Sequence, residues 1–477
     1  MSAERYRSPL ETRYASDRMQ SIWSDRHRIG LWRRLWLALA ESQHELGLPV
    51  TAEQVAELRE HLDDIDFERA REFEAELRHD VMAHVHTLRE VAPTAGPIVH
   101  LGATSQFVNC NAELLMLHES LGVIAAKLAA TIGALSEFAR TWRALPTLAF
   151  THYQPAQPTT VGRRAAGWAY DLSLCLEDIE ARRDGLRLRG VKGTTGTQAS
   201  FMALMDNDAD RVDELDRLVC ERMGWDADRR LLLTGQTYPR LIDAQVLGSL
   251  ATVAAVLHKI TTDIRLLANR KELEEPFESK QIGSSAMAYK RNPMRCERIG
   301  GMARFVMGLA QNPLQTAAVQ WLERTLDDSS NRRLVLPEAF LALDGCLDVM
   351  RNVASGMVVY EHTVVANLAA ELPFMATENL LMAAVRGGAD RQDAHEVIRT
   401  HSQAAAQAVK QEGKPNDLLA RIAGEPMFDG IDLDDVLDPA AYVGRAPEQV
   451  DRFLAEVAGP IAGRYADSDP AETELRV

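Results

Sequence analysis

Several features that mark secreted, membrane or nucleic-acid-binding proteins are scarce in this sequence. Only five cysteines occur in 477 residues, and no CxxC pair joins them, so neither a disulfide framework nor a cysteine-based metal site is expected. Basic residues are outnumbered, with 53 Lys and Arg against 69 Asp and Glu. The net charge of -16 argues against a nucleic-acid or membrane partner, although a single pocket can still be basic.

Targeting and membrane segments are also lacking. The first residues are charged and contain no apolar core of the kind found in signal peptides. No apolar run looks long enough to span a bilayer. We therefore expect a cytoplasmic protein whose thiols are reduced and buried.

Strand-like alternation is nearly absent, and helical spacing takes its place. Apolar residues recur three or four positions apart from Asn111 to Trp142, a stretch that reaches roughly 45 Å as a helix. The same pattern runs through 247–267 and 340–357, and less cleanly through 161–186. Long helices with narrow apolar seams predict an all-α fold with one elongated central bundle. Several separate helical hairpins are the alternative.

Two smaller helical regions flank this bundle. The N-terminal one holds predicted helices over 21–46 and 52–77, and the C-terminal one begins near Glu361. The sequence thus predicts three domains. They are an N-terminal helical domain (1–105), a central long-helix bundle (106–358) and a C-terminal helical domain (359–477).

Three histidines lie close together in the loop over 78–86. His79, His84 and His86 lack the spacing that would place ligands on one helix face, and no cysteine is nearby. We therefore expect no metal, and buried hydrogen-bonded histidines are the favoured interpretation.

Three further loops break the helical pattern with small and polar residues, as loops that carry sites often do. Thr104 and Ser105 either cradle a carboxylate or cap a helix. His152, just before a predicted proline-bearing helix start, is either structural or catalytic. The Gly-Thr segment at 190–197 lacks the residue order of a P-loop, so it either lines a cleft or forms a turn.

The segment at 283–298 is strongly basic and opens with Gly-Ser-Ser. A helix is predicted to start near Asn292, with Pro293 in its first turn. A helix N-terminus and several cations beside two serine hydroxyls favour an alkoxide or bind an anion. A solvated basic loop is the alternative. The cations are Lys290, Arg291, Arg295 and Arg298.

This segment resembles the signature loop of the fumarase/aspartase superfamily. Within that superfamily, residues 289–295 resemble the form of the loop found in the adenylosuccinate lyase family. Residues 151–157 and 100–105 are similar to two further blocks shared by that superfamily. The likeness covers nearly the whole chain in order. It continues through 13–16, 234–238 and 323–333. It implies a three-domain all-α fold, a cytoplasmic homotetramer with active sites shared between subunits, and a role in purine synthesis.

The resemblance also implies a reaction, the β-elimination of fumarate from a C–N bond. The substrates would be adenylosuccinate, which gives AMP, and the succinylaminoimidazole carboxamide ribotide of purine biosynthesis, which gives the aminoimidazole carboxamide ribotide. Ser284 is the implied base, with Ser285 as second choice, and His152 is the implied acid, with His79 in support. No metal or organic cofactor is required.

The other implied residues bind or stabilise the substrate. Lys290, together with the hydroxyls at 104–105, would stabilise the dianionic intermediate, and arginines would bind the phosphate. The implied substrate-binding set is Arg13, Tyr14, Arg78, Asp80, Thr104, Ser105, Gln236, Ser285, Asn292, Arg298, Arg324, Ser329 and Arg333.

One position departs from the family pattern. The family usually has proline where this chain has Ala288. We expect the change to affect the rate of loop closure rather than the chemistry. Two alternatives remain: another fumarate-releasing lyase of the superfamily, acting on argininosuccinate or a plain dicarboxylate, and a non-catalytic helical scaffold.

Overall fold

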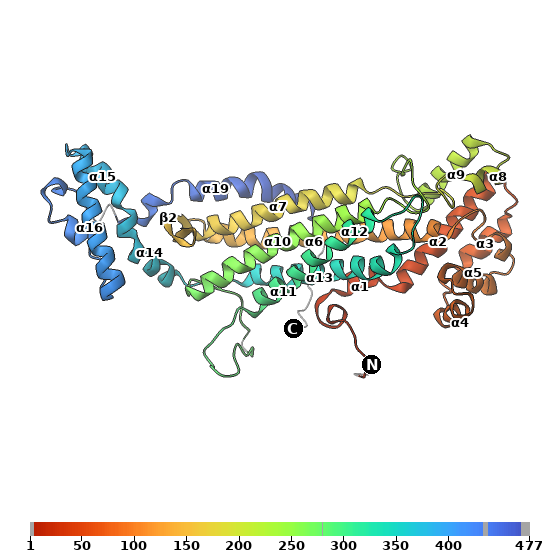
Figure 1. The fold of residues 1–477 in the computed structure, drawn as a ribbon, viewed down its shortest axis with the longest axis horizontal. Coiled ribbons are helices and arrows are strands. Elements are labelled where there is room, and N and C mark those ends of the chain that lie inside the picture. Colours follow the sequence, from red (N-terminus) through yellow and green to blue (C-terminus); the bar gives the residue numbers. More distant parts are fainter. Residues whose placement is uncertain (1–3, 279, 433–436, 469–477) are drawn as a thin grey trace.

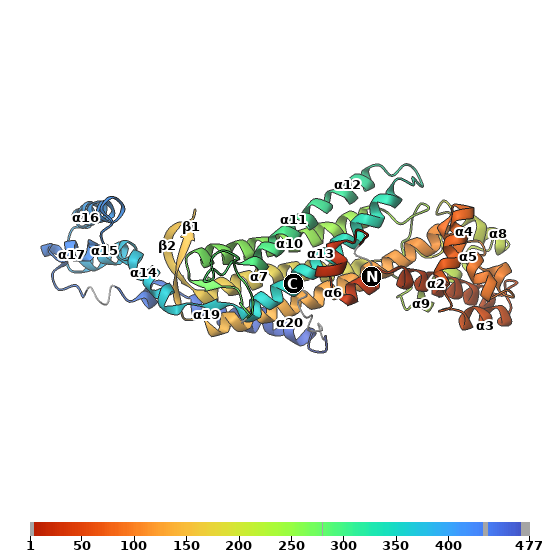
Figure 2. The same cartoon turned by 90° about the horizontal axis from the view of Figure 1, so that it is seen from below.

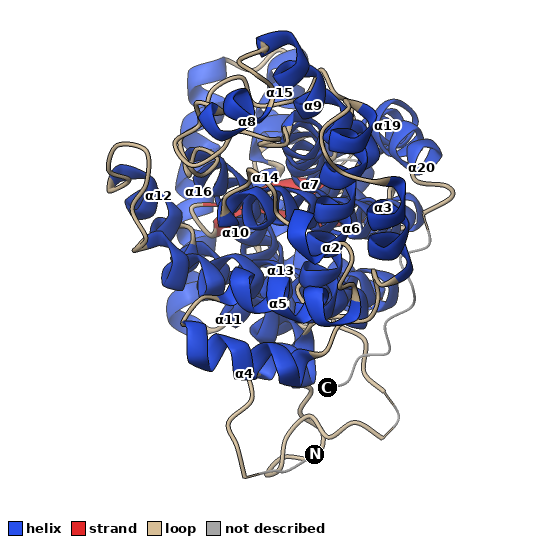
Figure 3. Ribbon diagram, turned by 90° about the vertical axis from the view of Figure 1, so that its right-hand side faces the viewer, coloured by secondary structure: helices blue, strands red, loops and turns tan. Residues whose placement is uncertain are grey.

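The computed structural model describes residues 4–278, 280–432 and 437–468 as a long, mostly helical molecule (Figure 1). Long helices lie side by side along its length, with a smaller helical region at each end (Figures 1 and 2). Seen end-on, helices fill most of the section and only short strands interrupt them (Figure 3). The predicted all-α fold with one elongated bundle is therefore confirmed.

The N-terminal region packs around one end of the bundle. Ser24 caps the longest helix of this region by accepting a hydrogen bond from the His27 backbone N–H. The single helix predicted over 52–77 is two helices, because the chain leaves helical geometry at 61–66 and Asp66 caps a new start. The elements are η1 (Leu10–Tyr14), α1 (Asp17–Ile22), α2 (Asp25–Glu45), α3 (Ala52–Glu60), α4 (Phe67–Leu77), α5 (Asp80–Val91) and η2 (Gly96–Ile98).

The central bundle is built on four helices of 25 residues or more: α7 and α13 pack on the longest, α6, and α10 packs on α7 and α13. Leu117, Ile124 and Leu128 of α6 are completely buried, as their helical spacing predicts. The elements are α6 (Ser105–Thr141), β1 (Pro146–Thr151), β2 (Gln154–Thr160), α7 (Val161–Gly185), α8 (Ala199–Leu204), α9 (Ala209–Arg222), α10 (Leu241–Asn269), β3 (Leu273–Glu274), α11 (Met294–Leu309), α12 (Gln311–Ala318), α13 (Asp328–Gly356) and β4 (Val358–Val359).

Two of these helices correct the expectation that no apolar run could span a bilayer. By length and composition alone, α6 and α10 are each apolar enough to cross a membrane. Their most apolar 18-residue windows are 61% and 50% buried inside the protein. The apolar faces pack on α7, α11 and α13, so core packing accounts for much of the hydropathy.

The segment at 146–160 corrects a second expectation, because it forms a β-hairpin rather than a helix start. Strands β1 and β2 pair antiparallel, with Thr151 opposite Gln154 and a bulge between Thr147 and Ala149. A second short ladder joins β3 to β4. The polar, proline-containing sequence of β2 hides the strand from a search for apolar alternation.

The C-terminal region has its own hydrophobic cluster, which includes Leu380 and Ile422. Its last helices, α19 and α20, return to pack on α7 and α6 of the bundle. The predicted boundaries at 105 and 358 stay a prediction. The elements are α14 (Glu361–Met375), α15 (Thr377–Arg386), α16 (Arg391–Glu412), α17 (Leu418–Ile422), η3 (Pro426–Phe428), η4 (Pro439–Tyr442), α19 (Ala446–Phe453), η5 (Leu454–Ala458) and α20 (Gly459–Arg464).

Candidate active site

A polar cavity of about 530 Å³, here called the N-terminal cavity, lies where the N-terminal region meets the bundle. Its walls come from the α4–α5 turn, the first turns of α6, Arg240 and the segment at 324–333. Seven residues predicted from the sequence meet there. They are Arg78, His79, Asp80, Ser105, Arg324, Ser329 and Arg333.

The α4–α5 turn presents three consecutive polar residues to this cavity. Arg78 ends α4 in the left-handed conformation, with φ of 56°, which reverses the chain within one residue. His79 then caps α5, because its Nδ1 accepts a hydrogen bond from the Met82 backbone N–H at 3.3 Å. That bond leaves Nε2 as the ring nitrogen available to a substrate.

An ion pair ties this turn to the bundle. Arg333 Nη2 donates to Asp80 Oδ2 at 2.8 Å. Burial opposes ionisation of Asp80, but the hydrogen bond and positive charge of Arg333 outweigh it, so the pKa of the carboxyl is lowered. Asp80 is therefore ionised at neutral pH and holds Arg333 at the cavity wall.

A buried network of charges supports the same wall from behind. Asp328 Oδ2 accepts hydrogen bonds from Arg324 Nη1 at 2.9 Å and from Arg240 Nε at 2.7 Å. Arg332 Nε donates to Asp243 Oδ2 at 2.7 Å. Paired charges in a buried setting fix one geometry, because leaving either partner alone is costly.

Sequence reasoning missed this network. It assigned a role to Arg333 but none to Arg332, Asp328, Arg240 or Asp243. Neighbouring residues on a helix point about 100° apart. Arg332 therefore turns into the core while Arg333 is exposed. The dense acidic and basic pattern at 323–333 is the only signal that the sequence offers.

Two more predicted residues adjoin segments that line the N-terminal cavity. Thr104 occupies the N-cap position of α6, but its hydroxyl makes no capping hydrogen bond and is available for a ligand. Gln236 is held beside the Arg324 segment, because its backbone N–H donates to Glu323 O at 2.9 Å.

The signature loop places Ser284 in a distinctive environment. Its Oγ accepts hydrogen bonds from the backbone N–H groups of Ala286 and Met287, at 3.3 and 3.2 Å. Asn292 closes the loop by donating from Nδ2 to Gly283 O at 2.8 Å. The chain bends so tightly here that a Cβ on Gly283 would lie 2.2 Å from Lys290 O.

Neighbouring residues of the loop are more open. Ser285 and Lys290 are exposed, and no hydrogen bond to Ser285 Oγ is found within the described ranges. The helix predicted near Asn292 begins two residues later, as α11 at Met294, with Pro293 as its N-cap.

Three other predicted residues gather beside the bundle. Arg298, on α11, is close enough to Arg13 and Tyr14 of η1 to feel their charges. Burial and the neighbouring Arg13 charge lower the pKa of Arg298, while Tyr14 opposes the shift. The turn sits close to α13, since a Cβ on Gly345 would lie 2.7 Å from Tyr14 O.

His152 stands apart from both groups, at the tip of the β1–β2 hairpin. His152 and Tyr153 form a two-residue turn in which both have positive φ, 53° and 57°. This is the geometry of a tight hairpin turn, and it leaves the His152 side chain exposed. The predicted helix start lies further on, at Val161.

The N-terminal cavity, the signature loop and the hairpin that carries His152 do not meet within one chain. Ser105 begins α6, and His152 follows its end; at 37 residues, α6 spans about 55 Å. The hairpin therefore lies at the opposite end of the bundle from the N-terminal cavity (Figure 1). The signature loop follows the 29-residue α10 and projects from the bundle below the hairpin end in that view (Figure 1).

The remaining candidates have structural surroundings. His84 stacks edge-on against Trp32 and Phe67, and burial lowers its pKa to about 4. The Gly-Thr segment at 190–197 packs tightly against the backbone at 234–235, because a Cβ on Gly196 would lie 1.8 Å from Thr234 O. The 4–278, 280–432 and 437–468 ranges contain no group of three metal-ligating side chains.

Comparison with known proteins explains why the sequence motifs at 100–105, 151–157 and 283–298 occur in one chain. The family model described as Lyase matches residues 11–308, and the one described as Adenylosuccinate lyase C-terminus matches residues 373–453. The adenylosuccinate lyase of Schizosaccharomyces pombe is 52% identical over 454 residues, which cover 94% of each chain. The chain belongs to the adenylosuccinate lyase family. The enzyme of Saccharomyces cerevisiae is 50% identical over 94% of each chain, and that of Schistosoma mansoni 47% over 97%.

Solved structures support the fold of this adenylosuccinate lyase family member. The 3-carboxy-cis,cis-muconate lactonizing enzyme of Pseudomonas putida has a TM-score of 0.81 at 25% identity, covering 96% of this chain and 99% of its own. A fumarate lyase from Mesorhizobium sp. BNC1 has a TM-score of 0.80 at 24% identity, covering 95% and 100%. The same helical architecture therefore serves several lyases and a lactonizing enzyme.

Proposed function

We propose that this chain splits fumarate from adenylosuccinate, giving AMP, and from the succinylaminoimidazole carboxamide ribotide, giving the aminoimidazole carboxamide ribotide. The observation that carries the proposal is the N-terminal cavity, where seven residues implied by the family motifs line one polar space. Relatives at about 50% identity over 94% of both chains are adenylosuccinate lyases. Identity at this level over nearly the whole chain argues against the two alternatives, a sibling lyase with another substrate and a non-catalytic scaffold.

The elimination begins at Ser284 in this proposal. Its alkoxide takes a proton from the carbon beside a carboxylate of the succinyl group. Two backbone N–H groups already donate to Ser284 Oγ, and hydrogen bonds to an ionised acceptor stabilise it by about 1.5–3 kcal/mol each. This environment lowers the cost of the alkoxide and favours Ser284 over Ser285 as the base.

The leaving nitrogen takes its proton from His152. The electron pair of the broken C–H bond forms the C=C bond of fumarate, and the C–N bond breaks. Lys290, Thr104 and Ser105 stabilise the dianionic aci-carboxylate that precedes this step, and His79 supports His152.

Arginines bind the substrate phosphate. Arg324 and Arg333 both lie at the wall of the N-terminal cavity, and guanidinium groups bind phosphate oxygens with two hydrogen bonds at once. The other predicted contacts are Arg13, Tyr14, Arg78, Asp80, Gln236, Ser285, Asn292, Arg298 and Ser329.

The active form proposed here is a homotetramer in which each site takes residues from several subunits. Hydropathy supports subunit association, since half of the apolar window of α10 is unburied in the single chain. The length of α6 supports site sharing, because about 55 Å of helix lies between Ser105 and the segment that leads to His152 in one chain. The cytoplasm is the proposed location, and five free, buried cysteines suit a reducing compartment.

The direct test is a fumarate-release assay with each of the two nucleotides. We expect turnover of both, no turnover of argininosuccinate, and loss of both activities in Ser284→Ala. Release of fumarate from argininosuccinate alone would assign the chain to a sibling activity. Absence of turnover with every substrate, in protein that is folded and tetrameric, would support the scaffold alternative.

A further inference from the structure

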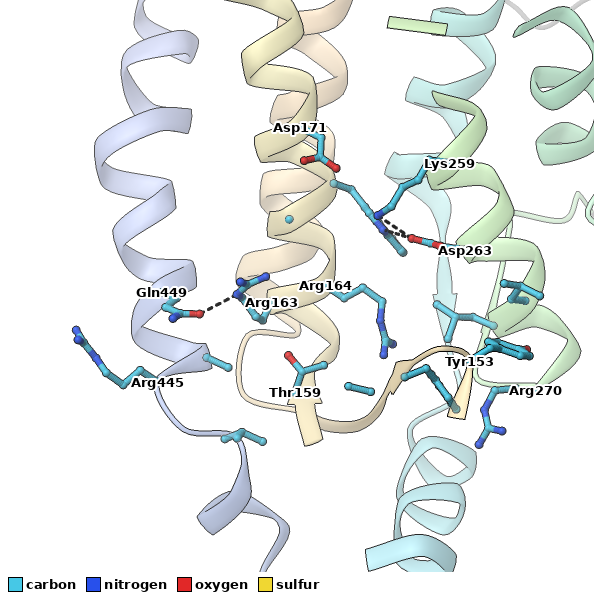
Figure 4. A pocket seen from close by; sticks show the side chains of 18 residues that line it. Tyr153, Thr159, Arg163, Arg164, Asp171, Lys259, Asp263, Arg270, Arg445 and Gln449 are labelled. Atoms are coloured by element: carbon cyan, nitrogen blue, oxygen red, sulfur yellow. Dashed lines mark hydrogen bonds and ion pairs between the residues drawn. The ribbon is translucent and has the colours of Figure 1, made fainter. Parts of the chain in front are cut away.

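A second cavity, of about 610 Å³, lies behind the β1–β2 hairpin and is called the hairpin cavity here. Its walls are the inner side of the hairpin, α7, the end of α10 and the segment at 443–449 (Figure 4). None of the residues assigned to the reaction lines it. Five cationic side chains and only two carboxylates do, in a chain whose net charge is -16.

Arg164 is the most unusual of these cations. Its only hydrogen bond in the described parts of the chain runs from Nη2 to Leu148 O at 2.8 Å, and no carboxylate pairs with it there. Burial lowers the pKa of its guanidinium, and the nearby carboxylates of Glu272 and Asp263 offset this only in part. The side chain reaches from α7 toward the space between Thr159 and Tyr153 (Figure 4).

Asp263 and Glu272, the carboxylates that act on Arg164, have other hydrogen-bond partners. Asp263 Oδ2 accepts from Trp168 Nε1 and from Lys259 Nζ, both at 2.9 Å. Glu272 Oε1 accepts from Arg270 Nε at 2.9 Å, and its buried Oε2 has no hydrogen-bond partner among the described residues. Neither carboxylate forms an ion pair with Arg164 in the described residues, so Arg164 is a partly desolvated cation whose nearby negative charges are shared with Lys259 and Arg270.

A second guanidinium stands beside it on the same helix. Arg163 Nε donates to the neutral Gln449 Oε1 at 2.8 Å, which spends one of its five N–H groups (Figure 4). Arg270 lies across the cavity with its guanidinium 4.8 Å from the centre of the Phe150 ring. Arg445 points away from the others and adds only its charge (Figure 4).

We propose that the hairpin cavity binds a small polyanion, a phosphate or phosphate ester, held by Arg164 and Arg163. A guanidinium offers two parallel N–H groups that match two phosphate oxygens, and the bond is stronger where water is partly excluded. The anion supplies the ion-pair partner that Arg164 lacks among the described residues.

Such a ligand would act on the hairpin that carries His152. Phe150, Tyr153 and Thr159 of the hairpin all face the cavity, as do Arg163 and Arg164 of α7. A bound anion therefore connects the hairpin to the bundle and restricts the movement of His152. Within one chain the hairpin cavity is about one bundle length from the N-terminal cavity, so the two are lined by different residues.

The test is equilibrium dialysis of the intact enzyme against radiolabelled inorganic phosphate. We expect two bound phosphates per chain in the wild type, one at the proposed substrate site and one in the hairpin cavity. Arg164→Gln should lose the phosphate in the hairpin cavity and keep the one at the substrate site. Arg333→Ala should lose the phosphate at the substrate site and keep the one in the hairpin cavity. Arg182→Gln, on the same helix but outside the cavity, should keep both.

Arg163→Gln covers the case in which Arg164→Gln does not fold. Arg163 lies at the rim of the hairpin cavity, and its replacement should weaken the affinity for one phosphate by at least about tenfold. Retention of both phosphates in the Arg163 variant and in any folded Arg164 variant would overturn the proposal. So would a wild type that binds one phosphate, lost with Arg333→Ala. Because the two sites are counted separately, failure at one leaves the other result intact.

Discussion

The N-terminal cavity and the signature loop hold predicted active-site residues in opposite physical settings. In the cavity, Arg333 is fixed by an ion pair with Asp80, and Arg324 by an ion pair with Asp328 of the buried network. In the loop, Ser285 and Lys290 are exposed, and Ser284 is held mainly by local backbone N–H groups. The cavity wall is therefore preformed before substrate binds, whereas the signature loop is held by few contacts.

This difference assigns different tasks to the two regions. A preformed set of cations suits binding, because little ordering cost is left when the phosphate arrives. An exposed loop suits chemistry that must close over a bound substrate. Substitutions in the loop should therefore change turnover without changing stability, and substitutions in the cavity should change affinity or stability.

The largest effect is expected from Ser284→Ala. Loss of the base should lower kcat by about 10³- to 10⁴-fold. Substrate affinity and unfolding should stay close to wild type, because the loop side chain supports no core packing. Single-turnover kinetics and binding to the inactive variant measure both. Ser285→Ala is the matched control; an inactive Ser285→Ala beside an active Ser284→Ala would reverse the assignment.

Asp328→Ala should have the next largest effect, on stability. It leaves Arg240 and Arg324 without their shared carboxylate, and unpairing a buried charge costs about 3–5 kcal/mol. Urea unfolding followed by circular dichroism measures the loss. The exposed neighbour Asp327→Ala should unfold like wild type. Equal stability of the two variants would show that the buried network is not what holds the cavity.

Arg333→Ala should weaken nucleotide binding more than it slows bound substrate. The lost contact is charge-assisted and worth about 1.5–3 kcal/mol, which raises KM by roughly 10- to 150-fold. Arg333→Lys keeps the charge without the paired N–H groups and should lie between. An unchanged KM in both variants would remove Arg333 from the phosphate site.

The smallest effect concerns pH. Burial lowers the pKa of His84 to about 4 in the folded protein, whereas an unfolded histidine titrates near 6.5. The unfolded state thus binds more protons between these values, and stability falls as pH drops from 6.5 toward 4. Because of His84, the free energy of unfolding should be about 1.4 kcal/mol lower at pH 5.5 than at pH 7.5.

His84→Phe tests that linkage. The ring stacks between Trp32 and Phe67, and its Nδ1 has no hydrogen-bond partner in the described residues, so a phenyl ring should be tolerated. The difference in unfolding free energy between pH 7.5 and 5.5 should shrink in this variant. An unchanged difference would mean that other groups carry the acid sensitivity.

Periodic elements of the fold could be predicted, and elements set by tertiary contacts could not. The seam that includes Leu117 and Leu128 reveals α6, because one face of a helix repeats in the sequence. The hairpin around His152 carries no such repeat; its register depends on two positive-φ residues and on pairing between polar strands. The sequence pattern also predicts one helix over 52–77, where the structure has two, α3 and α4.

The candidate site divides in the same way. Motif resemblance supplied Arg78, His79 and Arg333, which the fold brings to one cavity. It did not supply Arg332 or Asp328, because which of two adjacent arginines faces the core depends on the rotation of α13. The hairpin cavity has no sequence signature at all, since residues about 300 positions apart, such as Arg163 and Gln449, form it.

The central claim is that no chain completes its own active site, and mixing two inactive variants tests it most directly. His79→Ala damages the N-terminal cavity, and His152→Ala damages the hairpin at the other end of the bundle. The two are dissociated, mixed in equal amounts and reassembled, and mass measurement verifies the hybrids. If each site takes the two residues from different chains, about a quarter of the sites are intact and activity returns to roughly a quarter of wild type. Verified hybrids that stay as inactive as the two parents would contradict the claim.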